Sequence, residues 1–128
     1  MINKTQLCFR RMLDADLESV LKLEVAGHAV PWAKGIFVDC LRAGCYCVLL
    51  EFEKQLIAYG IMSAAASEAH ILNVCVNNKF LRQGFGRIVI LHLLAAAKQN
   101  KVRSVFLEVR PSNKVAVHLY ESLGFLEI

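Results

Sequence analysis

Apolar residues alternate with polar ones in some parts of the chain and recur at helical spacing in others, which separates strands from helices. Short apolar runs bounded by turn residues predict strands at residues 7–12, 46–52, 56–63, 69–76 and 102–109. Helical spacing, with capping residues at the ends, predicts helices at residues 14–27, 33–43, 87–98 and 113–123. The predicted order of elements is therefore β-α-α-β-β-β-α-β-α.

This order predicts an α+β fold, a mixed α/β arrangement around one sheet. Glu53 and Lys54 form a tight turn between two of the strands, which indicates a hairpin. The run 69–76 carries apolar residues on both faces, as expected of a central strand that is covered on each side. We expect a central, mostly antiparallel sheet with helices on both faces, and a β-α-β unit in the second half.

The length of 128 residues predicts one domain that spans residues 1–128. Apolar residues make up 56% of the chain and charged residues 20%, which excludes a disordered chain, a collagen-like fibre and a coiled coil. The longest apolar stretch, 88–97, is about half the length of a membrane span and contains His92. Because the first residues also lack the apolar run of a signal peptide, we expect a soluble cytoplasmic protein without a membrane partner.

The five cysteines are odd in number and form no CxxC pair, so the sequence predicts reduced thiols rather than disulfides. A zinc site needs more ligands at tight spacing, and the four histidines are scattered through the chain. We therefore expect no metal, and small thiols that act as hydrophobic residues at Cys8, Cys40, Cys45, Cys47 and Cys75.

Basic residues gather in the second half of the chain, although the net charge of +4 is mild. The first 78 residues are nearly balanced, with seven basic and eight acidic side chains. Between residues 79 and 114 the only acid is Glu108, and eight side chains are basic: Lys79, Arg82, Arg87, Lys98, Lys101, Arg103, Arg110 and Lys114. This asymmetry indicates a phosphate-bearing partner, either nucleic acid or a phosphorylated cofactor, unless it is an ordinary solvated surface.

Two glycines separate a predicted strand from the apolar helix that follows it. The segment reads, in order, Arg82, Gln83, Gly84, Phe85, Gly86 and Arg87. Glycines lack the Cβ atoms that would block a close ligand, and the first N–H groups of a helix point outward at its positive end. The segment therefore predicts a phosphate or pyrophosphate cradle, with a plain tight turn as the alternative. Val89 excludes the dinucleotide fingerprint GxGxxG, and the chain has no Gly-Lys-Ser/Thr sequence of a P-loop.

The stretch around these glycines, residues 77–87, resembles the acetyl-CoA pyrophosphate loop of the GNAT superfamily of N-acetyltransferases, which is usually written Gln/Arg-x-x-Gly-x-Gly/Ala. Gly84 and Gly86 match this pattern, whereas Leu81 stands where Gln or Arg is usual. The resemblance covers most of the chain and implies a GNAT-like acyl-CoA N-acyltransferase fold. Three further segments are similar to the bacterial ribosomal-protein-alanine N-acetyltransferases: residues 28–32, 107–113 and 116–125.

The resemblance also implies a cofactor, a partner and residue roles. Acetyl-CoA is the acetyl donor, Glu108 accepts the proton of the acceptor amine, directly or through a water, and Tyr120 protonates the CoA thiolate. The acceptor is the N-terminal peptide of a small-subunit ribosomal protein, with its alanine α-amine as the nucleophile. Contacts to the cofactor are implied for Val74, Cys75, Val76, Arg82, Gln83, Gly84, Phe85, Gly86, Arg87 and Asn113.

The chemistry of acetyl transfer fits these residue types. The amine must lose a proton, the oxyanion must be stabilised and the leaving thiolate should be protonated. Glu108 lies near the end of a predicted strand, where a partly buried carboxylate would be a better base. An ion pair with Arg103 or Arg110 is the alternative. Tyr120 equally suits a core position and Asn113 a helix N-cap.

Covalent catalysis by Cys75 is an alternative mechanism, but nothing in the sequence pairs this thiol with a base, so direct attack is expected. An α-amine suits a single carboxylate base, because its pKa of about 7.7–8.0 lies below the value of about 10.4 for lysine. Its deprotonation costs about 3 kcal/mol less. The loop 28–32, which starts at His28, would line a groove for the acceptor, with Trp32 as an aromatic wall or as a packing anchor.

Two other functions stay open at the level of the sequence. One is a GNAT enzyme that acetylates a small amine or a lysine. The other is a basic RNA-binding module, which requires exposed aromatic residues among the basic ones. Direct nucleic-acid binding is disfavoured, because core or turn positions are predicted for Phe80, Phe85, Phe106 and Phe125. Relatives continue beyond residue 128 with a β-hairpin, so we expect this hairpin to be missing here; no oligomeric state is predicted.

Overall fold

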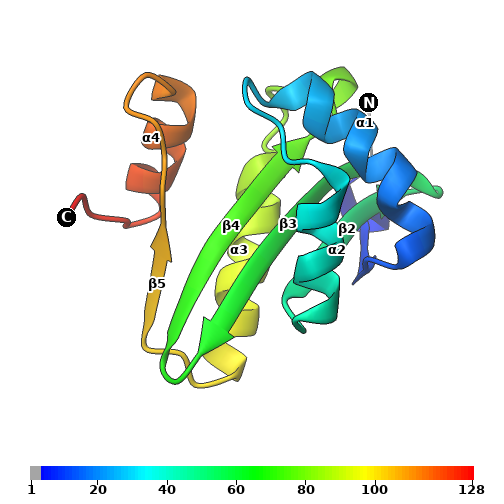
Figure 1. Ribbon diagram of the computed structural model, residues 1–128. Coiled ribbons are helices and arrows are strands. Elements are labelled where there is room, and N and C mark those ends of the chain that lie inside the picture. The colour runs from blue at the N-terminus through cyan, green and yellow to red at the C-terminus, as the bar shows by residue number, and fades with distance from the viewer. Residues whose placement is uncertain (1–3) are drawn as a thin grey trace.

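A five-stranded sheet forms the centre of the computed structural model, which describes residues 4–128 (Figure 1). The strands are β1 (Cys8–Arg11), β2 (Tyr46–Phe52), β3 (Gln55–Ala65), β4 (Glu68–Val76) and β5 (Ser104–Leu107). The helices are α1 (Leu17–Gly27), α2 (Lys34–Arg42), α3 (Phe85–Gln99) and α4 (Lys114–Ser122). Short 3-10 turns lie at Lys4–Gln6, Asp14–Asp16 and Asn78–Phe80. The predicted order of strands and helices and the α+β class are confirmed.

The strands are ordered β1-β2-β3-β4-β5, so neighbours in the sequence are neighbours in the sheet. Strands β1 to β4 pair antiparallel, and β4 and β5 pair parallel across the connection through α3. Glu53 and Lys54 both adopt positive φ in the turn between β2 and β3, as in a type I′ hairpin. The predicted hairpin and the predicted β-α-β unit are therefore confirmed.

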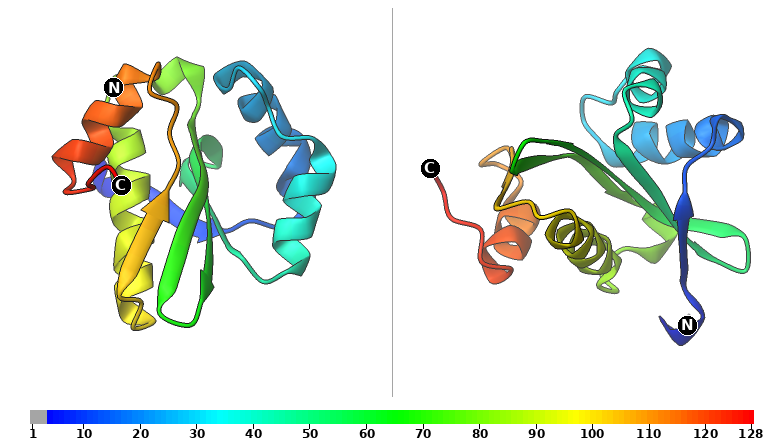
Figure 2. Two further views of the ribbon diagram at one scale, coloured as in Figure 1. Left: turned by 60° about the vertical axis from the view of Figure 1, so that its left-hand side comes forward. Right: turned by 90° about the horizontal axis from the view of Figure 1, so that it is seen from below.

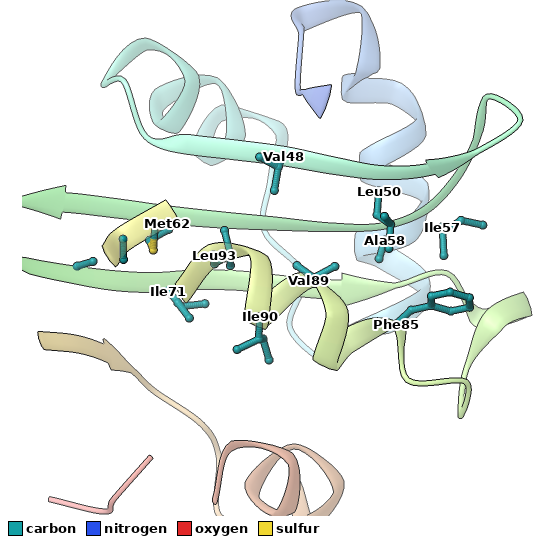
Figure 3. Packing of buried hydrophobic residues seen from close by; sticks show 12 residues of the cluster. Val48, Leu50, Ile57, Ala58, Met62, Ile71, Phe85, Val89, Ile90 and Leu93 are labelled. Atoms are coloured by element: carbon teal, nitrogen blue, oxygen red, sulfur yellow. The ribbon is translucent and has the colours of Figure 1, made fainter. Parts of the chain in front are cut away.

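Helices cover both faces of the sheet, with α1 and α2 on one face and α3 and α4 on the other (Figure 2). The core under α3 includes Val89 and Leu93 of the helix, packed against apolar side chains of β2, β3 and β4 (Figure 3). A second core lies under α1 and α2 around Phe37 and Tyr59. Gly60 on β3 lets α3 approach closely, because a Cβ at this position would lie 2.7 Å from Val89 Cγ1.

Most element boundaries differ from the sequence prediction by one to three residues; two of these differences, and one helix face, bear on the candidate site. Helix α3 begins at Phe85 rather than at residue 87, because Gly84 adopts φ 82° and serves as its N-cap. Strand β5 ends at Leu107 rather than at residue 109, because its pairing with β4 ends there. On α1, Val25 is 64% exposed although the spacing places it on the apolar face, and Glu24 is buried instead.

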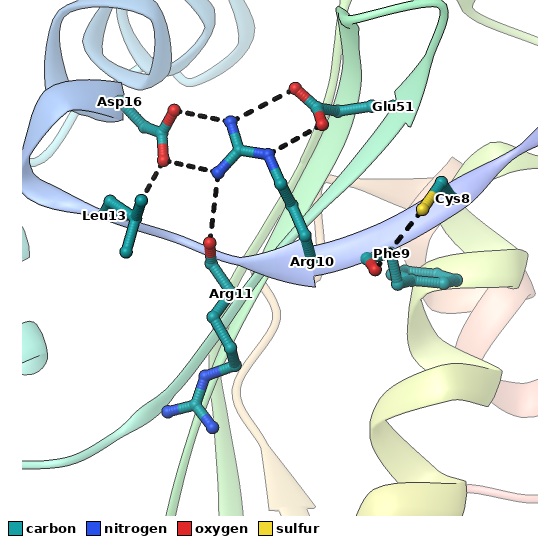
Figure 4. A network of polar contacts seen from close by, with 7 residues as sticks. All are labelled: Cys8, Phe9, Arg10, Arg11, Leu13, Asp16 and Glu51. Carbon is teal, nitrogen blue, oxygen red and sulfur yellow. Dashed lines mark hydrogen bonds and ion pairs between the residues drawn. The ribbon is translucent and has the colours of Figure 1, made fainter.

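A polar cluster around Arg10 joins β1 to β2 and to the turn that precedes α1 (Figure 4). The guanidinium donates to Asp16 Oδ1 and to Glu51 Oε1, each at 2.7 Å. Asp16 also accepts the backbone N–H of Leu13 at 2.7 Å. The Arg10 guanidinium holds the pKa of Asp16 below its usual value. This cluster therefore fixes the start of α1 to the sheet with charge-assisted hydrogen bonds.

The remaining expectations from the sequence concern a membrane span, a metal site and the two ends of the chain. No helix among residues 4–128 is long and apolar enough to cross a membrane. In the same range, no three His, Cys, Asp or Glu side chains are arranged to hold a metal ion. Residues 123–128, which follow α4, form no strand. The hairpin expected beyond residue 128 and the start of the chain, residues 1–3, lie outside the described residues.

Candidate active site

The two parallel strands of the sheet separate halfway along β4. Their last paired residues are Ile71 on β4 and Leu107 on β5, and no strand of residues 4–128 pairs with the second half of β4 on that side. Figure 1 shows β4 diverging from the chain that leads to α4. An open cleft lies beyond the last pair, and it is lined by Leu72, Glu108, Val109, Arg110 and Pro111.

A β-bulge in β4 lies at this point of separation. The register with β3 shifts by one residue between Ile71 and Asn73, so Leu72 is an extra residue in β4. Ile71 packs into the core under α3, whereas Asn73 contacts Glu24 of α1 on the opposite face. In a regular strand, residues two apart share a face. The bulge therefore turns the second half of β4 over relative to the first.

The free edge of β4 presents backbone N–H groups. In an antiparallel pair, residues that exchange hydrogen bonds with the partner alternate with residues that do not. Asn77 donates to Ile57 O at 2.8 Å, which identifies a hydrogen-bonded pair. Counting back from Asn77, Cys75 also turns toward β3, whereas Val74 and Val76 turn their N–H groups to the free edge. Of the predicted set 74–76, these two residues offer main-chain donors where the strands separate.

The turn between β4 and α3 has available main-chain donors. The backbone N–H groups of Gly84, Gly86 and Arg87 make no hydrogen bond to any residue of the range 4–128. They lie at the positive end of the α3 macrodipole, so the turn fits an anionic group. A Cβ at Gly86 would lie 3.6 Å from Leu119 Cδ2, an ordinary contact, so the fold itself does not require glycine there.

The side chains of this turn differ in their surroundings. Arg82 and Gln83 are exposed, and Arg82 adopts φ 62° in the left-handed region. Phe85 is buried in the core under α3. Arg87 donates from Nη1 to Ser122 Oγ at 3.0 Å, which ties the start of α3 to the end of α4. Phe85 thus anchors the turn in the core. The backbone N–H groups and the side chains of Arg82 and Arg87 give the turn its positive charge.

Glu108 follows β5 directly and lines the cleft. Its side chain is exposed, so the partial burial expected from the sequence is wrong; the chain leaves the sheet before this residue is covered. Glu108 makes no ion pair with Arg103, Arg110 or any other residue of the described range. The carboxylate is therefore open to a group that enters the cleft.

Tyr120 is half-buried on α4. Its ring packs edge-on against Phe125 with centroids 6.0 Å apart, and burial raises the pKa of its phenol. The hydroxyl makes no hydrogen bond within residues 4–128, and no side-chain oxygen there is both buried and unpaired, so it stays accessible. Asn113 Oδ1 accepts the N–H of Ala116 at 3.2 Å and caps α4. Tyr120 therefore combines core packing with an open proton donor.

Cys75 lies under α1, on the face of β4 opposite to α3. Its thiol is buried and donates to the carbonyl of Leu23 at 3.4 Å. Burial raises the pKa of this thiol to about 11. A Cβ at Gly27 would lie 2.7 Å from the sulfur, so α1 closes tightly over it. Cys75 is therefore a protonated, packed thiol near neutral pH.

A buried polar cluster between α1 and β4 was not predicted from the sequence. Glu24 is 1% exposed, and its Oε1 accepts from the Tyr59 hydroxyl and, at 2.8 Å, from Asn73 Nδ2. Its Oε2 accepts the backbone N–H of Trp32 at 2.9 Å. His28 Nε2 lies 3.0 Å from Asn73 Oδ1 and 3.5 Å from Glu24 Oε1. The one local signal for this cluster was an acidic residue at an inward position of the first helix.

Aromatic side chains near the cleft pack against other rings. Trp32, in the loop between α1 and α2, lies edge-on to Phe37 with centroids 5.1 Å apart, so it anchors this loop on α2. Phe106 stacks on His70 with centroids 5.3 Å apart. The surface of residues 4–128 offers no fully exposed ring to a nucleic-acid base at Phe80, Phe85, Phe106 or Phe125.

Comparison with known proteins agrees with this geometry. The sequence matches the acetyltransferase (GNAT) family over residues 12–125. The ribosomal protein bS18-alanine N-acetyltransferase of Salmonella typhimurium is 34% identical over 112 residues, which cover 88% of this chain and 76% of the relative. The crystal structure of the ribosomal-protein-S18-alanine N-acetyltransferase from Escherichia coli has a TM-score of 0.90 and 31% identity, and the match covers 95% of this chain and 79% of that one.

A more distant structure shares the fold alone. The paia N-acetyltransferase from Thermoplasma acidophilum, solved in complex with coenzyme A, has a TM-score of 0.76 at 15% identity, over 94% of this chain and 89% of that one. The fold class expected from the sequence is confirmed by these structures. With a family match that spans nearly all of its length and relatives above 30% identity, the chain belongs to the acetyltransferase (GNAT) family.

Proposed function

We propose that this chain transfers the acetyl group of acetyl-CoA to a protein N-terminus, and that the acceptor is the alanine α-amine of ribosomal protein bS18. The observation that carries the proposal is the set of unpaired main-chain donors at Gly84, Gly86 and Arg87, in the turn that follows β4, the strand whose separation from β5 opens a cleft. The names of the relatives at 34% and 31% identity support the acceptor.

The turn 82–87 fits the diphosphate of acetyl-CoA. It combines free N–H groups at a helix N-terminus with the charge of Arg82 and Arg87. The N–H groups of Val74 and Val76 along the free edge of β4 can donate hydrogen bonds to the amide carbonyl groups and the thioester carbonyl of acetyl-CoA. Asn113 would contact the same molecule through Nδ2, because its Oδ1 caps α4. Acetyl-CoA, when bound, supplies the activated acetyl group as a thioester.

Glu108 is the proposed proton acceptor and Tyr120 the proposed proton donor. Glu108 takes a proton from the α-ammonium group, directly or through a water, because its carboxylate lines the cleft and has no ion-pair partner in the described range. The neutral amine then attacks the thioester carbonyl, and as the C–S bond breaks the nitrogen loses its second proton to solvent, which leaves the amide. Tyr120 gives its proton to the leaving sulfur and regains one from solvent; burial keeps its phenol protonated until that step.

Direct attack is proposed in preference to an acyl-enzyme on Cys75. A thiolate, not a thiol, is the nucleophile, and a thiol with a pKa of about 11 is almost fully protonated at neutral pH. The sulfur is also buried beneath α1 rather than open to the cleft. The role that we assign to Cys75 is therefore packing behind the free edge of β4, rather than a reaction with the acetyl group.

A lysine or a small amine is the alternative acceptor. Glu108 is a single exposed carboxylate, so it suits the amine that loses its proton most easily. An α-amine has a pKa about 2.5 units below that of lysine. This difference and the names of the relatives favour the α-amine.

Mass spectrometry of model peptides tests the acceptor. Peptides that begin with alanine or serine, and a peptide with a blocked N-terminus and an internal lysine, are incubated with acetyl-CoA. We expect acetylation of the α-amine of the alanine peptide; modification of lysine alone would refute the assignment. Saturating acetyl-CoA should also raise the thermal unfolding midpoint, and an unchanged midpoint would contradict the cofactor.

Two variants test the proton transfers. Glu108→Gln should lower kcat by about 10²- to 10⁴-fold and leave the KM for acetyl-CoA unchanged, because the side chain meets the amine rather than the cofactor. Tyr120→Phe should also lower kcat, with an unchanged fold, since only a hydroxyl is removed. Glu121→Gln, an exposed change on α4 next to Tyr120, is the control and should keep full activity. Full activity of both test variants would show that the roles are wrongly assigned.

A further inference from the structure

His28 lies close to the free edge of β4, on the side of the sheet away from Tyr120. Its ring bonds to Asn73, the residue that precedes Val74. On the other side of Asn73, Leu72 lines the cleft. The loop between α1 and α2 covers the face opposite to α3 and α4 (Figure 2). A group bound at His28 would therefore approach the site of acetyl transfer from the face that α3 and α4 leave open.

The cluster around His28 determines which ring nitrogen carries the proton. Asn73 Nδ2 donates to Glu24, so the Asn73 oxygen is turned toward the ring. His28 Nε2 thus faces two acceptors, Asn73 Oδ1 at 3.0 Å and Glu24 Oε1 at 3.5 Å, and must be the protonated nitrogen. In the neutral ring, Nδ1 is then left with a lone pair as a hydrogen-bond acceptor.

The Nδ1 atom of His28 is open to solvent. It makes no hydrogen bond within residues 4–128. No side-chain nitrogen or oxygen of those residues is both buried and unpaired, and the His28 side chain is 35% exposed. The two ring nitrogens therefore differ. Nε2 is bonded to the buried cluster, whereas Nδ1 is accessible and can accept a hydrogen bond.

Apart from the ring of His28, the buried carboxylate of Glu24 has only neutral partners in the described part of the chain. Its hydrogen-bond donors are the Tyr59 hydroxyl, the Asn73 amide and the Trp32 backbone N–H, all of them neutral. Within residues 4–128 no lysine or arginine pairs with it, although it is 1% exposed. A buried charge is costly without a compensating partner, so the cluster attracts a cation at the accessible end of His28.

We propose that His28 Nδ1 accepts a hydrogen bond from the α-ammonium group of the protein acceptor, with Glu24 supplying the charge that selects a cation. This proposal rests on the proposed function and names the residue that recognises the acceptor's terminal amine. His28 is then a specificity residue, distinct from Glu108, which takes the proton.

Binding of two matched peptides tests this role. One peptide begins with alanine, and the other carries a propionyl group in its place and so lacks only the α-amine. Their dissociation constants are measured by titration calorimetry in the presence of coenzyme A, which prevents turnover. The wild type should prefer the amine by at least about tenfold, which corresponds to about 1.4 kcal/mol. His28→Ala should bind both peptides equally, with the affinity for the propionyl peptide unchanged.

Each outcome has a definite meaning. Retention of the preference in His28→Ala, equal binding of both peptides by the wild type, or an equal loss of affinity for both peptides in the variant would overturn the proposal. His118→Ala, an exposed histidine change on α4, is the control and should keep the preference. If the wild type prefers the amine and His28→Ala does not, but mass spectrometry shows no acetylation of the alanine peptide, the proposed function fails while the role of His28 stands.

Discussion

Gly86 lies at the second position of α3. Its replacement by alanine should affect the stability of the free protein and the affinity for acetyl-CoA in opposite directions. An added Cβ would meet Leu119 Cδ2 at 3.6 Å and Val76 Cγ2 at 3.7 Å, both ordinary contacts. Alanine also has the higher helix propensity, by up to about 1 kcal/mol. Gly86→Ala should therefore keep or raise the stability of the free protein, with a midpoint up to about 4 °C higher.

The same Cβ would stand beside free backbone donors that the proposed function assigns to a diphosphate. We expect acetyl-CoA to bind about tenfold more weakly, about 1.4 kcal/mol. At a ligand concentration of 100 Kd, bound ligand stabilises the wild type by about 2.7 kcal/mol, and the variant would keep about 1.4 kcal/mol of this. Thermal unfolding with and without acetyl-CoA measures both quantities in one series.

Gly35→Ala is the matched control, because Gly35 holds the same second position in α2 and a Cβ there has nothing within 4 Å. The control should show the same gain in helix propensity and an unchanged response to acetyl-CoA. An unchanged response in Gly86→Ala as well would refute the claim that the backbone of this turn grips the cofactor.

Three further predictions concern stability and thiol chemistry. Gly60→Ala should destabilise the protein by about 1–3 kcal/mol in denaturant unfolding, because its Cβ would lie 2.7 Å from Val89 Cγ1; an unchanged midpoint would contradict this. Arg10 lowers the pKa of Asp16, so their pair stabilises the fold above the unfolded pKa of about 3.9, and this is lost as pH falls through the lower folded pKa. Asp16→Asn should thus cost about 1 kcal/mol at pH 7 and less at acidic pH, where the carboxylate becomes protonated; an equal deficit across the range would exclude a charge effect. Cys75, with a pKa of about 11, should react with iodoacetamide more than about a hundredfold more slowly at pH 8 in the folded than in the unfolded protein, and equal rates would show an open thiol.

Local signals in the sequence predicted those parts of the fold that local chemistry determines. The bounds predicted for β2, residues 46–52, match the observed strand, because Gly44 ends α2 in the left-handed region and Glu53 and Lys54 turn the chain after it. The start of α3 was predicted two residues late, because Gly84 was treated as part of the turn rather than as the residue that caps the helix.

The features that shape the candidate site depend on contacts between distant residues. Glu24 and Asn73 are 49 residues apart, so the inward position of Glu24 on its helix does not indicate that an amide binds its carboxylate. Helical spacing placed Val25 inside, whereas the hydrogen bonds available to Glu24 turn α1 so that Val25 is exposed. The exposure of Glu108 likewise depends on where β5 leaves β4, and no pattern in residues 102–109 marks that point.

The extra residue Leu72 explains why the free donors and the buried cluster occur at the same place. Before it, Ile71 points into the core under α3; after it, Asn73 points toward Glu24 beneath α1. If Leu72 were instead a regular residue of the strand, Asn73 would lie on the α3 side, two residues after Ile71, and Glu24 would lose its amide donor. The N–H of Val74 would then turn toward β3, because the direction of hydrogen bonding alternates along a strand. The bulge at Leu72 therefore decides both which residues of β4 present N–H groups to the open edge and that Asn73 faces Glu24.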